Sequence, residues 1–389
     1  MPPLRIVQTS MGRFHHFDLA RQMHRLGFLE AIFTGYPRWK LRQENLPAEK
    51  IRTFPWLQTV YMAKSRFGIA SRRLDRALAW WSLETLDGHV AKNLPDCDVF
   101  VGLSGAGLRT GREAQRRGAQ HVCDRGSAHI RFQNLILREE FERWGAPFFG
   151  IDPRVIAREE AEYAAANIIT VPSEFALRSF ASCGLSAVKL RKVPYGVNLQ
   201  RFKPDGHPDR NVFDVLTIGQ ISFQKGFPYL LEAFRKLKHP RKRLIVIGSM
   251  QPEIERWLVG KDLAGVEFRG VVSQTELASV ISRCHVMVLA SVQDGFGLVL
   301  AEAMACGCPV IATEHTGGPD LITNAVEGFV VPIRDANVIA ERLERLAQDD
   351  GLRARMSGAA LERVRRLGGW NEYGQAFADL CLELAARRN

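Results

Sequence analysis

Short apolar runs typical of buried strands alternate along the chain with longer segments whose apolar residues recur at helical spacing. The runs expected to be strands are residues 4–9, 98–103, 121–123, 167–173, 212–218, 244–247, 266–270, 286–290 and 310–312. The segments expected to be helices are residues 14–26, 139–162, 174–183, 228–237, 274–283, 298–305 and 370–385. This alternation appears in both halves of the chain and predicts an α/β protein with parallel sheets.

The stretch 286–312, VMVLASVQDGFGLVLAEAMACGCPVIA, predicts a strand, a glycine-containing loop, a helix over residues 298–305 and a second strand. Unpaired backbone N–H groups and the dipole at the start of such a helix attract phosphate. Glu302 lies inside this otherwise apolar helix, where a buried carboxylate without a partner is costly. From these residues alone, two interpretations stay open: an ordinary βαβ unit with a solvated glutamate, or a site in which Glu302 binds a ribose diol.

Two further loops follow expected strands, at the sheet edge where open α/β proteins bind ligands. Asp124 and His129 share the loop 124–129, and each is either a titratable group of a site or a satisfied structural residue. Gly12 follows the first expected strand, at a turn where the backbone could approach a phosphate. A single glycine in a turn is weak evidence on its own.

Two short motifs point elsewhere and are discounted. Residues 96–98 spell D-x-D, a metal- and nucleotide-binding motif of a different fold, but three residues match often by chance. Gly105, Gly107 and Gly111, with Asp124 beyond them, imitate a dinucleotide fingerprint with one residue too many between the last two glycines. A nicotinamide-dependent oxidoreductase is therefore the weakest of the hypotheses considered.

Composition narrows the classes of protein that fit. The 389 residues suffice for two domains, and no segment approaches the roughly 20 apolar residues that span a bilayer. The N-terminal residues are typical of a first strand and lack the layout of a signal peptide. The seven cysteines are an odd number without a C-x-x-C pair, which favours reduced thiols in the cytoplasm over a zinc site.

The formal net charge of +11 lies almost entirely in the first half. Residues 1–200 hold 29 basic and 19 acidic side chains, whereas residues 201–389 hold 24 and 23. Basic residues are concentrated within 38–42 and 64–76, with Trp39, Phe67 and Trp80 as neighbouring aromatic residues. Such a mixture suits an anionic membrane surface or nucleic acid, but no nucleic-acid fold motif accompanies it. An anionic membrane surface or substrate is the expected partner, with plain solubility as the alternative.

Several motifs of the second half, in the same order along the chain, resemble those of the retaining glycosyltransferases of family 4, the glycosyl transferases group 1. The motifs are residues 194–204, the loop 219–226, the stretch 294–302 with an acidic residue at each end, residues 317–319 and residues 327–328. The resemblance is weaker in the first half, where it rests on the order of strands and the loop 124–129. The family usually has Glu and Arg where this chain has Asp294 and Gln220.

The resemblance implies an α/β fold of the GT-B type, in which two Rossmann-like domains with parallel sheets face each other across a cleft. The expected acceptor-binding domain is residues 1–197, joined by a C-terminal helix within 370–389 that crosses back onto it. The expected nucleotide-sugar-binding domain is residues 198–369. Such enzymes stabilise the departing diphosphate with cations and helix N-termini, so neither a metal nor a cofactor is expected.

The resemblance also implies roles for single residues. Lys225 is expected to contact the diphosphate, Glu302 the ribose and Asp294 the sugar hydroxyls. Asp124 would lie beside the reacting sugar carbon, with His129 as the alternative for that place. The remaining donor-binding candidates are Gly12, Gln220 and the residues whose amides begin the helix, Phe296, Gly297 and Leu298.

The leading hypothesis is a retaining, metal-independent hexosyltransferase that uses a nucleotide-diphosphate sugar and acts on a glycan or a lipid-linked acceptor. Its expected place is the cytoplasm, attached peripherally at the inner face of the membrane, as suits polysaccharide biosynthesis. The alternative is a catalytically silent GT-B protein that binds a sugar or a partner, because Gln220 and Asp294 depart from the family pattern. Hydrolysis of the donor would separate an active transferase from such a binding protein.

Overall fold

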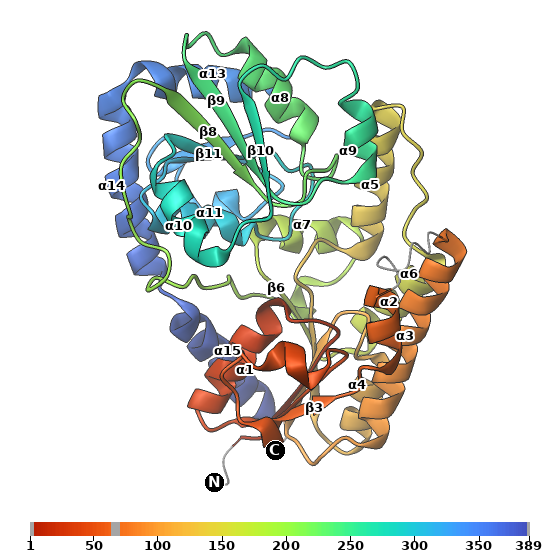
Figure 1. The fold of residues 1–389 in the computed structure, drawn as a ribbon. Coiled ribbons are helices and arrows are strands. Elements are labelled where there is room, and N and C mark those ends of the chain that lie inside the picture. The colour runs from red at the N-terminus through yellow and green to blue at the C-terminus, as the bar shows by residue number, and fades with distance from the viewer. Residues whose placement is uncertain (1–3, 64–70, 387–389) are drawn as a thin grey trace.

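The computed structural model describes residues 4–63 and 71–386. It contains two sheets, one in each half of the chain, with helices packed against them (Figure 1). The first sheet has seven strands in the order β3-β2-β1-β4-β5-β6-β7, and the second has six in the order β10-β9-β8-β11-β12-β13. The strand pairs of both sheets are parallel. The predicted α/β architecture with parallel sheets is confirmed.

The first half begins with a strand and alternates strands with helices. Its strands are β1 (Ile6–Ser10), β2 (Leu29–Thr34), β3 (Ile51–Thr53), β4 (Val99–Leu103), β5 (Gln120–Asp124), β6 (Ile168–Val171) and β7 (Leu190–Lys192). Its helices are α1 (Phe14–Arg25), α2 (Trp56–Ala63), α3 (Arg72–Lys92), α4 (Leu108–Arg116), α5 (Ile130–Arg143), α6 (Pro153–Ala165) and α7 (Glu174–Ser182).

The second half repeats the alternation and ends in helices. Its strands are β8 (Phe213–Ile218), β9 (Lys242–Ile247), β10 (Val266–Gly270), β11 (Val286–Leu289), β12 (Val310–Thr313) and β13 (Gly328–Val331). Its helices are α8 (Phe227–Lys236), α9 (Pro252–Trp257), α10 (Gln274–Ser282), α11 (Leu298–Ala305), α12 (Gly318–Leu321), α13 (Ala336–Gln348), α14 (Asp350–Leu367) and α15 (Trp370–Ala386).

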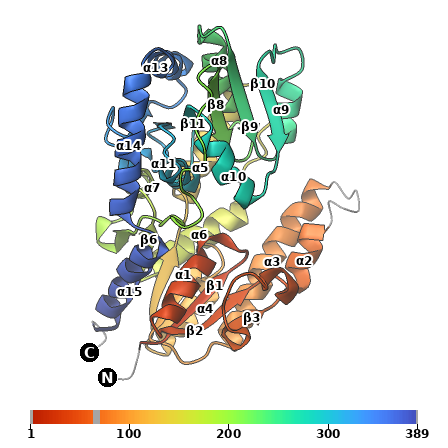
Figure 2. The ribbon, with the colours of Figure 1, turned by 60° about the vertical axis from the view of Figure 1, so that its left-hand side comes forward.

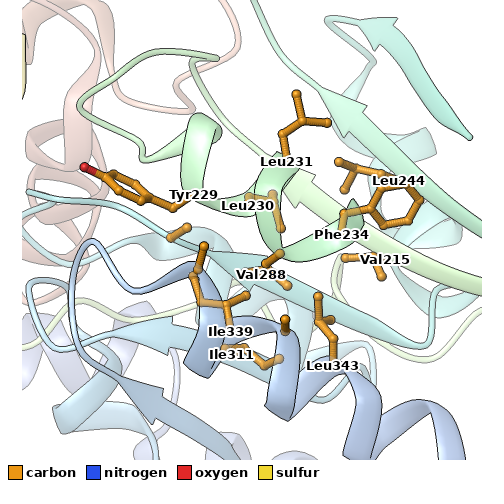
Figure 3. Packing of buried hydrophobic residues seen from close by; sticks show 14 of the residues in the cluster. Val215, Tyr229, Leu230, Leu231, Phe234, Leu244, Val288, Ile311, Ile339 and Leu343 are labelled. Atoms are coloured by element: carbon orange, nitrogen blue, oxygen red, sulfur yellow. The ribbon is translucent and has the colours of Figure 1, made fainter. Parts of the chain in front are cut away.

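The central strands of the second sheet, β8 and β11, are almost entirely buried, and β11 is apolar throughout, as suits a sheet with helices on both faces. Figure 3 shows one of these faces, where α8 and α13 lie on the sheet. The side chains in contact there include Val215, Leu230, Phe234, Leu244, Val288, Ile311, Ile339 and Leu343. This packing holds the carboxyl ends of β8 and β11, and therefore the loops that follow them, in fixed positions.

The last helix leaves the second half and packs against the first, as predicted (Figure 2). Tyr373 and Phe377 of α15 belong to the buried cluster that contains Phe17 of α1. Gly374 approaches α1 so closely that a Cβ atom there would lie 2.3 Å from the Cβ atom of Gln22. None of the helices within the described ranges is long and apolar enough to cross a membrane.

The two chain segments that connect the halves lie side by side. Val197 forms an isolated parallel bridge with Gly369, and a Cβ atom on Gly196 would lie 2.3 Å from the carbonyl carbon of Gly369. The domain boundaries predicted here, residues 1–197 with 370–389 against 198–369, stay a prediction.

Residues 139–162 do not form the single helix that was predicted. The helix α5 begins earlier, at Ile130, and ends at Arg143, and α6 begins only at Pro153. Between them the chain turns at Gly145 and Gly150, which both adopt positive φ angles. The break gives the two helices different directions and different partners.

Candidate functional site

The two halves touch where loop 124–129 of the first meets the loop after β11 of the second. A Cβ atom on Gly295 would lie 2.0 Å from the carbonyl oxygen of Gly126, so the two backbones are in direct contact. The Ser173 hydroxyl donates to the Gly295 carbonyl at 2.6 Å, and the Gln293 side-chain amide donates to the Ser127 hydroxyl at 2.7 Å. The predicted residues Asp124 and Asp294 therefore lie on facing edges of the two sheets.

Asp124 is the last residue of β5, and only 2% of its surface is exposed. Its carboxylate accepts a hydrogen bond from Thr170 at 2.7 Å and lies 2.8 Å from His15 Nε2 and 3.2 Å from His16 Nε2. Burial alone would raise the pKa of Asp124, but the charges and hydrogen bonds of these neighbours outweigh it and hold that pKa below its usual range. Asp124 is therefore a fixed, ionised carboxylate at the carboxyl end of β5, next to the loop that touches the second half.

Tyr195 lies between the two loops and touches residues of both halves. Its hydroxyl oxygen is 3.2 Å from His15 Nε2, and its ring centroid lies 4.3 Å from that of His15 and 5.4 Å from that of Phe296. Burial, with Asp124 as the next contribution, raises the pKa of Tyr195 well above its usual value. The neutral phenol therefore keeps its proton and can donate a hydrogen bond.

Lys225 and Asp294 form an ion pair on the second half, near its contact with the first. The Lys225 Nζ atom lies 2.5 Å from Asp294 Oδ2, and both side chains remain partly exposed. The backbone amide of Asp294 donates to the carbonyl of His315 at 2.9 Å, which holds the loop in place. The structure thus brings together the predicted diphosphate contact and the predicted sugar contact.

The loop before α11 turns into the helix at Gly297, which has a φ angle of +75°. A Cβ atom there would lie 2.5 Å from the Leu289 side chain, so the turn requires glycine. The sequence led us to expect a free Phe296 amide. This amide is instead bonded, because it donates to Asp294 Oδ1 at 3.3 Å. Among the described residues, the amides of Gly297 and Leu298 have no hydrogen-bond acceptor. Two of the three predicted amides are therefore available to a ligand.

Glu302 lies in the middle of α11 and is only partly exposed, and its side chain has no hydrogen-bond or ion-pair partner in the described part of the chain. Burial raises the pKa of Glu302 to about 7, and the charge of Arg201 opposes this shift. A carboxylate that is mostly buried without a partner is unusual in a stable helix. These surroundings favour a ligand site over a fully solvated glutamate, and the assignment of Glu302 to a ribose stays a prediction.

Two other predicted residues, Gly12 and Gln220, lie in loops that follow strands. Gly12 lies in the bend between β1 and α1, where a Cβ atom would meet the rings of Phe14 and Tyr36 at 3.0 and 3.2 Å. Gln220 is exposed in the loop after β8, beside a small hollow that Lys225 also lines. Both therefore lie at carboxyl ends of strands, as a donor site requires.

His129 is in a structural position. Its ring accepts a hydrogen bond from the amide of Arg131 at 3.2 Å and so begins α5, and it packs against Tyr163 and Phe180. Only 1% of the residue is exposed, and burial lowers its pKa to about 4. Between the two candidates for the place beside the sugar, the geometry favours Asp124.

His15, His16 and Asp124 form the group in the described residues that could hold a metal ion, since their ligand atoms lie within 4.8 Å of one another. Burial lowers the pKa of His16 to about 3, so its ring is neutral, and within the described residues neither ring nitrogen has a hydrogen-bond partner. Two imidazoles and a carboxylate are a ligand set that zinc accepts. The expectation of no metal stays a prediction.

His15 and Tyr195 were not among the residues predicted from the sequence. They reach the site from positions 109 and 71 residues away from Asp124 along the chain. The available signal was the position of His15 itself, in the first turn of a helix after a strand and beside Gly12.

Comparison with known proteins places the chain in a family. The family model described as glycosyl transferases group 1 matches residues 200–363. A D-inositol 3-phosphate glycosyltransferase from Pseudarthrobacter chlorophenolicus is 30% identical over 297 residues, which cover 67% of this chain and 70% of that protein. The chain belongs to the glycosyl transferases group 1. The family resemblance inferred from the sequence motifs is confirmed.

Solved glycosyltransferase structures share the fold. Sucrose-phosphate synthase from Thermosynechococcus elongatus superposes with a TM-score of 0.74 at 21% identity, covering 99% of this chain and all of that one. HepE from Anabaena, solved in complex with UDP, superposes with a TM-score of 0.70 at 15% identity, covering 98% and 100%. These matches confirm the expected GT-B fold of two facing Rossmann-like halves.

Matches to other members of this glycosyltransferase family cover less of each protein. A D-inositol 3-phosphate glycosyltransferase from Streptomyces bingchenggensis is 32% identical over 257 residues, 59% of this chain and 55% of that protein. The next two relatives are covered over 61% and 44% of their lengths. The chain thus spans about half the length of these relatives.

Proposed function

We propose that this member of the glycosyl transferases group 1 moves a hexose from a nucleotide-diphosphate sugar to a glycan or lipid-linked acceptor, with retention of configuration and without a metal. The observation that carries the proposal is the backbone contact between Gly126 and Gly295, which places the loop that begins at Asp124 against the loop of the Lys225–Asp294 pair. An ionised carboxylate on one edge and a cation on the other suit a sugar whose anomeric carbon and leaving diphosphate lie between them.

The donor would lie mainly on the second half. In this arrangement, Lys225 and the free amides at the start of α11 stabilise the negative charge of the departing diphosphate. Glu302 accepts hydrogen bonds from the ribose, Asp294 from the sugar, and the bend at Gly12 allows the first half to approach the phosphates. Gln220 stands at the edge of the same hollow and supplies hydrogen bonds without a charge.

The reacting carbon would lie against the first half. Glycosyl transfer develops positive charge on the sugar ring, and a nearby carboxylate stabilises that charge. Asp124 is held ionised mainly by His15 and Thr170, which makes it suited to this task. His15 and Tyr195 would fix the acceptor hydroxyl on the same side of the sugar.

The acceptor is proposed to be anionic or presented at an anionic membrane surface. The +10 charge of residues 1–200 lies on the half that would carry it. Trp39, Trp56 and Trp81 are 61%, 72% and 55% exposed on that half. A relative from Corynebacterium glutamicum, 25% identical over 55% of this chain and 61% of its own, is named as a phosphatidylinositol monomannoside mannosyltransferase. We therefore propose three things together: a nucleotide-sugar donor, an anionic or membrane-presented acceptor, and a peripheral location at the membrane.

The experiment that tests the proposal is turnover of a panel of nucleotide-diphosphate sugars, with NMR assignment of the anomeric configuration of the product. We expect at least one donor to release its nucleotide diphosphate slowly in water and faster with an acceptor, and the product to keep the donor's configuration. Inversion would contradict the retaining mechanism. Binding of a donor without any release would favour the silent GT-B binding protein.

A further inference from the structure

The helix α5 is attached to both halves of the molecule. It begins in the first half, where the His129 amide donates to the Ser179 hydroxyl at 2.8 Å and Arg131 pairs with Glu160. Its later turns lie beside the second half (Figure 1). Ile136, 6% exposed, belongs to the buried cluster formed by the second half's own sheet. α5 therefore links the two halves as a strut, from the loop of Asp124 to the second half.

The end of α5 is seated in an aromatic socket of the second half. The ring centroid of Trp144 lies 5.3 Å from that of Tyr229 and 5.5 Å from that of Trp257. Its indole N–H donates to Glu140 Oε1 at 2.6 Å. Glu140 is fully buried, so its carboxylate must be satisfied on both oxygens.

Arg334, in the turn after β13, supplies the second partner. Its Nε donates to Glu140 Oε2 at 2.8 Å, its Nη1 to Glu139 at 3.1 Å and its Nη2 to the Ile136 carbonyl at 3.3 Å. One guanidinium group from the second half thus binds α5 at three positions, residues 136, 139 and 140.

The backbone of Arg334 gives an independent indication that this side chain has a purpose. Its φ angle is +61°, in the left-handed region where a residue with a Cβ atom is strained and glycine is not. A glycine would suit the turn better, so the arginine side chain must compensate for the strain. The three hydrogen bonds to α5 are the compensation that the structure shows.

We propose that Arg334 is a positioning residue for glycosyl transfer, which fixes the far end of the α5 strut and thereby sets the spacing between Asp124 and the Lys225–Asp294 pair. The inference rests on the proposed function. Among the proposed donor-binding groups, Lys225, Asp294 and Glu302 belong to the second half and the first half contributes only the bend at Gly12, so donor binding depends little on the strut. Glycosyl transfer needs groups from both halves, so it needs the strut.

The test compares two variants that relax the same type of backbone strain. Arg334→Gly combined with Glu140→Gln removes the tie, keeps the Trp144 hydrogen bond and leaves no unpaired buried charge. Ala325→Gly is the matched control, because Ala325 also has a left-handed φ angle, +68°, but is exposed and makes no link to the first half. Arg334→Lys, which keeps the charge but not the three-pronged geometry, serves as the conservative variant.

Hydrogen exchange reports on the strut without any need for activity. We expect the amides of residues 125–133 to exchange at least fivefold faster in the double variant, while those of β8 and β11 and all amides of Ala325→Gly stay as in the wild type. Unchanged exchange over residues 125–133 would overturn the proposal.

Kinetics then separates positioning from mere stability. In the double variant, kcat for transfer should fall at least tenfold per folded molecule, the Kd of the nucleotide diphosphate should stay within twofold, and Arg334→Lys should recover part of the loss. A kcat within twofold of the wild type would refute the positioning role. If the wild type itself neither binds nor turns over any nucleotide-sugar, the proposed function fails, while the exchange experiment still tests the strut.

Discussion

At the scale of single residues, two carboxylates of the second half have opposite surroundings. Asp294 is paired with Lys225 at 2.5 Å, whereas Glu302 is mostly buried, has no partner in the described chain and has a pKa raised to about 7 by burial. A buried carboxylate of this kind lowers stability unless a ligand satisfies it. We therefore interpret Glu302 as a group kept for binding at a cost in stability.

Replacement of Glu302 by Ala should weaken donor binding and leave the fold intact. The loss of charge-assisted hydrogen bonds to the ribose is expected to cost about 1.5–3 kcal/mol of binding free energy. Calorimetric titration with the nucleotide diphosphate measures the change. An unchanged affinity together with a normal melting curve would refute the ribose assignment.

The pH dependence of stability gives a second test of the same residue. Because the folded-state pKa of Glu302 is about 7, above the usual 4.5, the folded chain keeps a proton that the unfolded chain releases between these values. Its contribution to the free energy of unfolding is therefore favourable at low pH and is lost as the pH rises toward 7. Glu302→Gln should stabilise the protein by about 1–3 kcal/mol at pH 8 and by much less at pH 4.5.

Urea unfolding at both pH values measures this difference. Glu362→Gln, an exposed position on α14, is the control. An equal effect of Glu302→Gln at pH 4.5 and pH 8 would show that the Glu302 carboxylate is not perturbed.

Single residues also show which parts of the candidate site could not be predicted from the sequence. Asp124, Lys225, Asp294 and Glu302 were predicted because they stand in recognisable motifs or at ends of strands. His15 and Tyr195 were missed because only the tertiary fold brings them to Asp124 and to each other. Local pattern carries no information about a contact between positions 180 residues apart.

At the scale of elements, the sequence predicted α11 at its observed bounds, Leu298–Ala305, because glycines mark both of its ends. Gly297 and Gly307 each have a φ angle of +75°, a conformation that stops a helix of L-residues. The segment 139–162 was mispredicted although Gly145, Gly150 and Pro153 marked a break. Its charged, helical composition masked these signals, and the packing of Trp144 on the other half is not a local property.

Gly297→Ala should destabilise the protein by about 2–4 kcal/mol, because it combines left-handed backbone strain with a contact of 2.5 Å to Leu289. Gly260→Ala is the matched control, since its φ angle is also +75° but nothing lies within 4 Å of the added Cβ atom. Urea unfolding of both variants measures the difference. Equal losses of stability would mean that the close contact at Gly297 relaxes freely.

At the scale of the whole molecule, the basic charge and the exposed tryptophans lie on the same half. The sequence correctly assigned the basic charge to the first half, but it did not identify every aromatic residue that is exposed there. Trp80 is half-buried beneath Arg154, and its neighbour Trp81 is the exposed one. Residues 64–70, which were part of the predicted basic cluster, lie outside the described residues. Lys40 lies over the rings of Tyr36 and Trp39 within the other predicted cluster.

The protein should bind anionic liposomes at low salt and leave them at high salt, because each Lys or Arg near such a surface contributes roughly 1 kcal/mol within a Debye length. Trp56→Ser should weaken the binding severalfold. Val259→Ser, which changes an 80% exposed residue of the nearly neutral second half, should not. Co-sedimentation measures all three. Equal pelleting with zwitterionic liposomes would contradict an electrostatic membrane contact.

The account as a whole depends on a cation that meets a leaving diphosphate across the cleft from Asp124. The measurement that tests it most directly is the rate of nucleotide-diphosphate release from the best donor, compared between the wild type, Lys225→Ala and Lys236→Ala, an exposed lysine on α8. We predict at least a tenfold loss for Lys225→Ala, with a smaller effect on donor affinity, and no loss for Lys236→Ala. A rate within twofold of the wild type for Lys225→Ala, or no release by the wild type from any donor, would contradict the account.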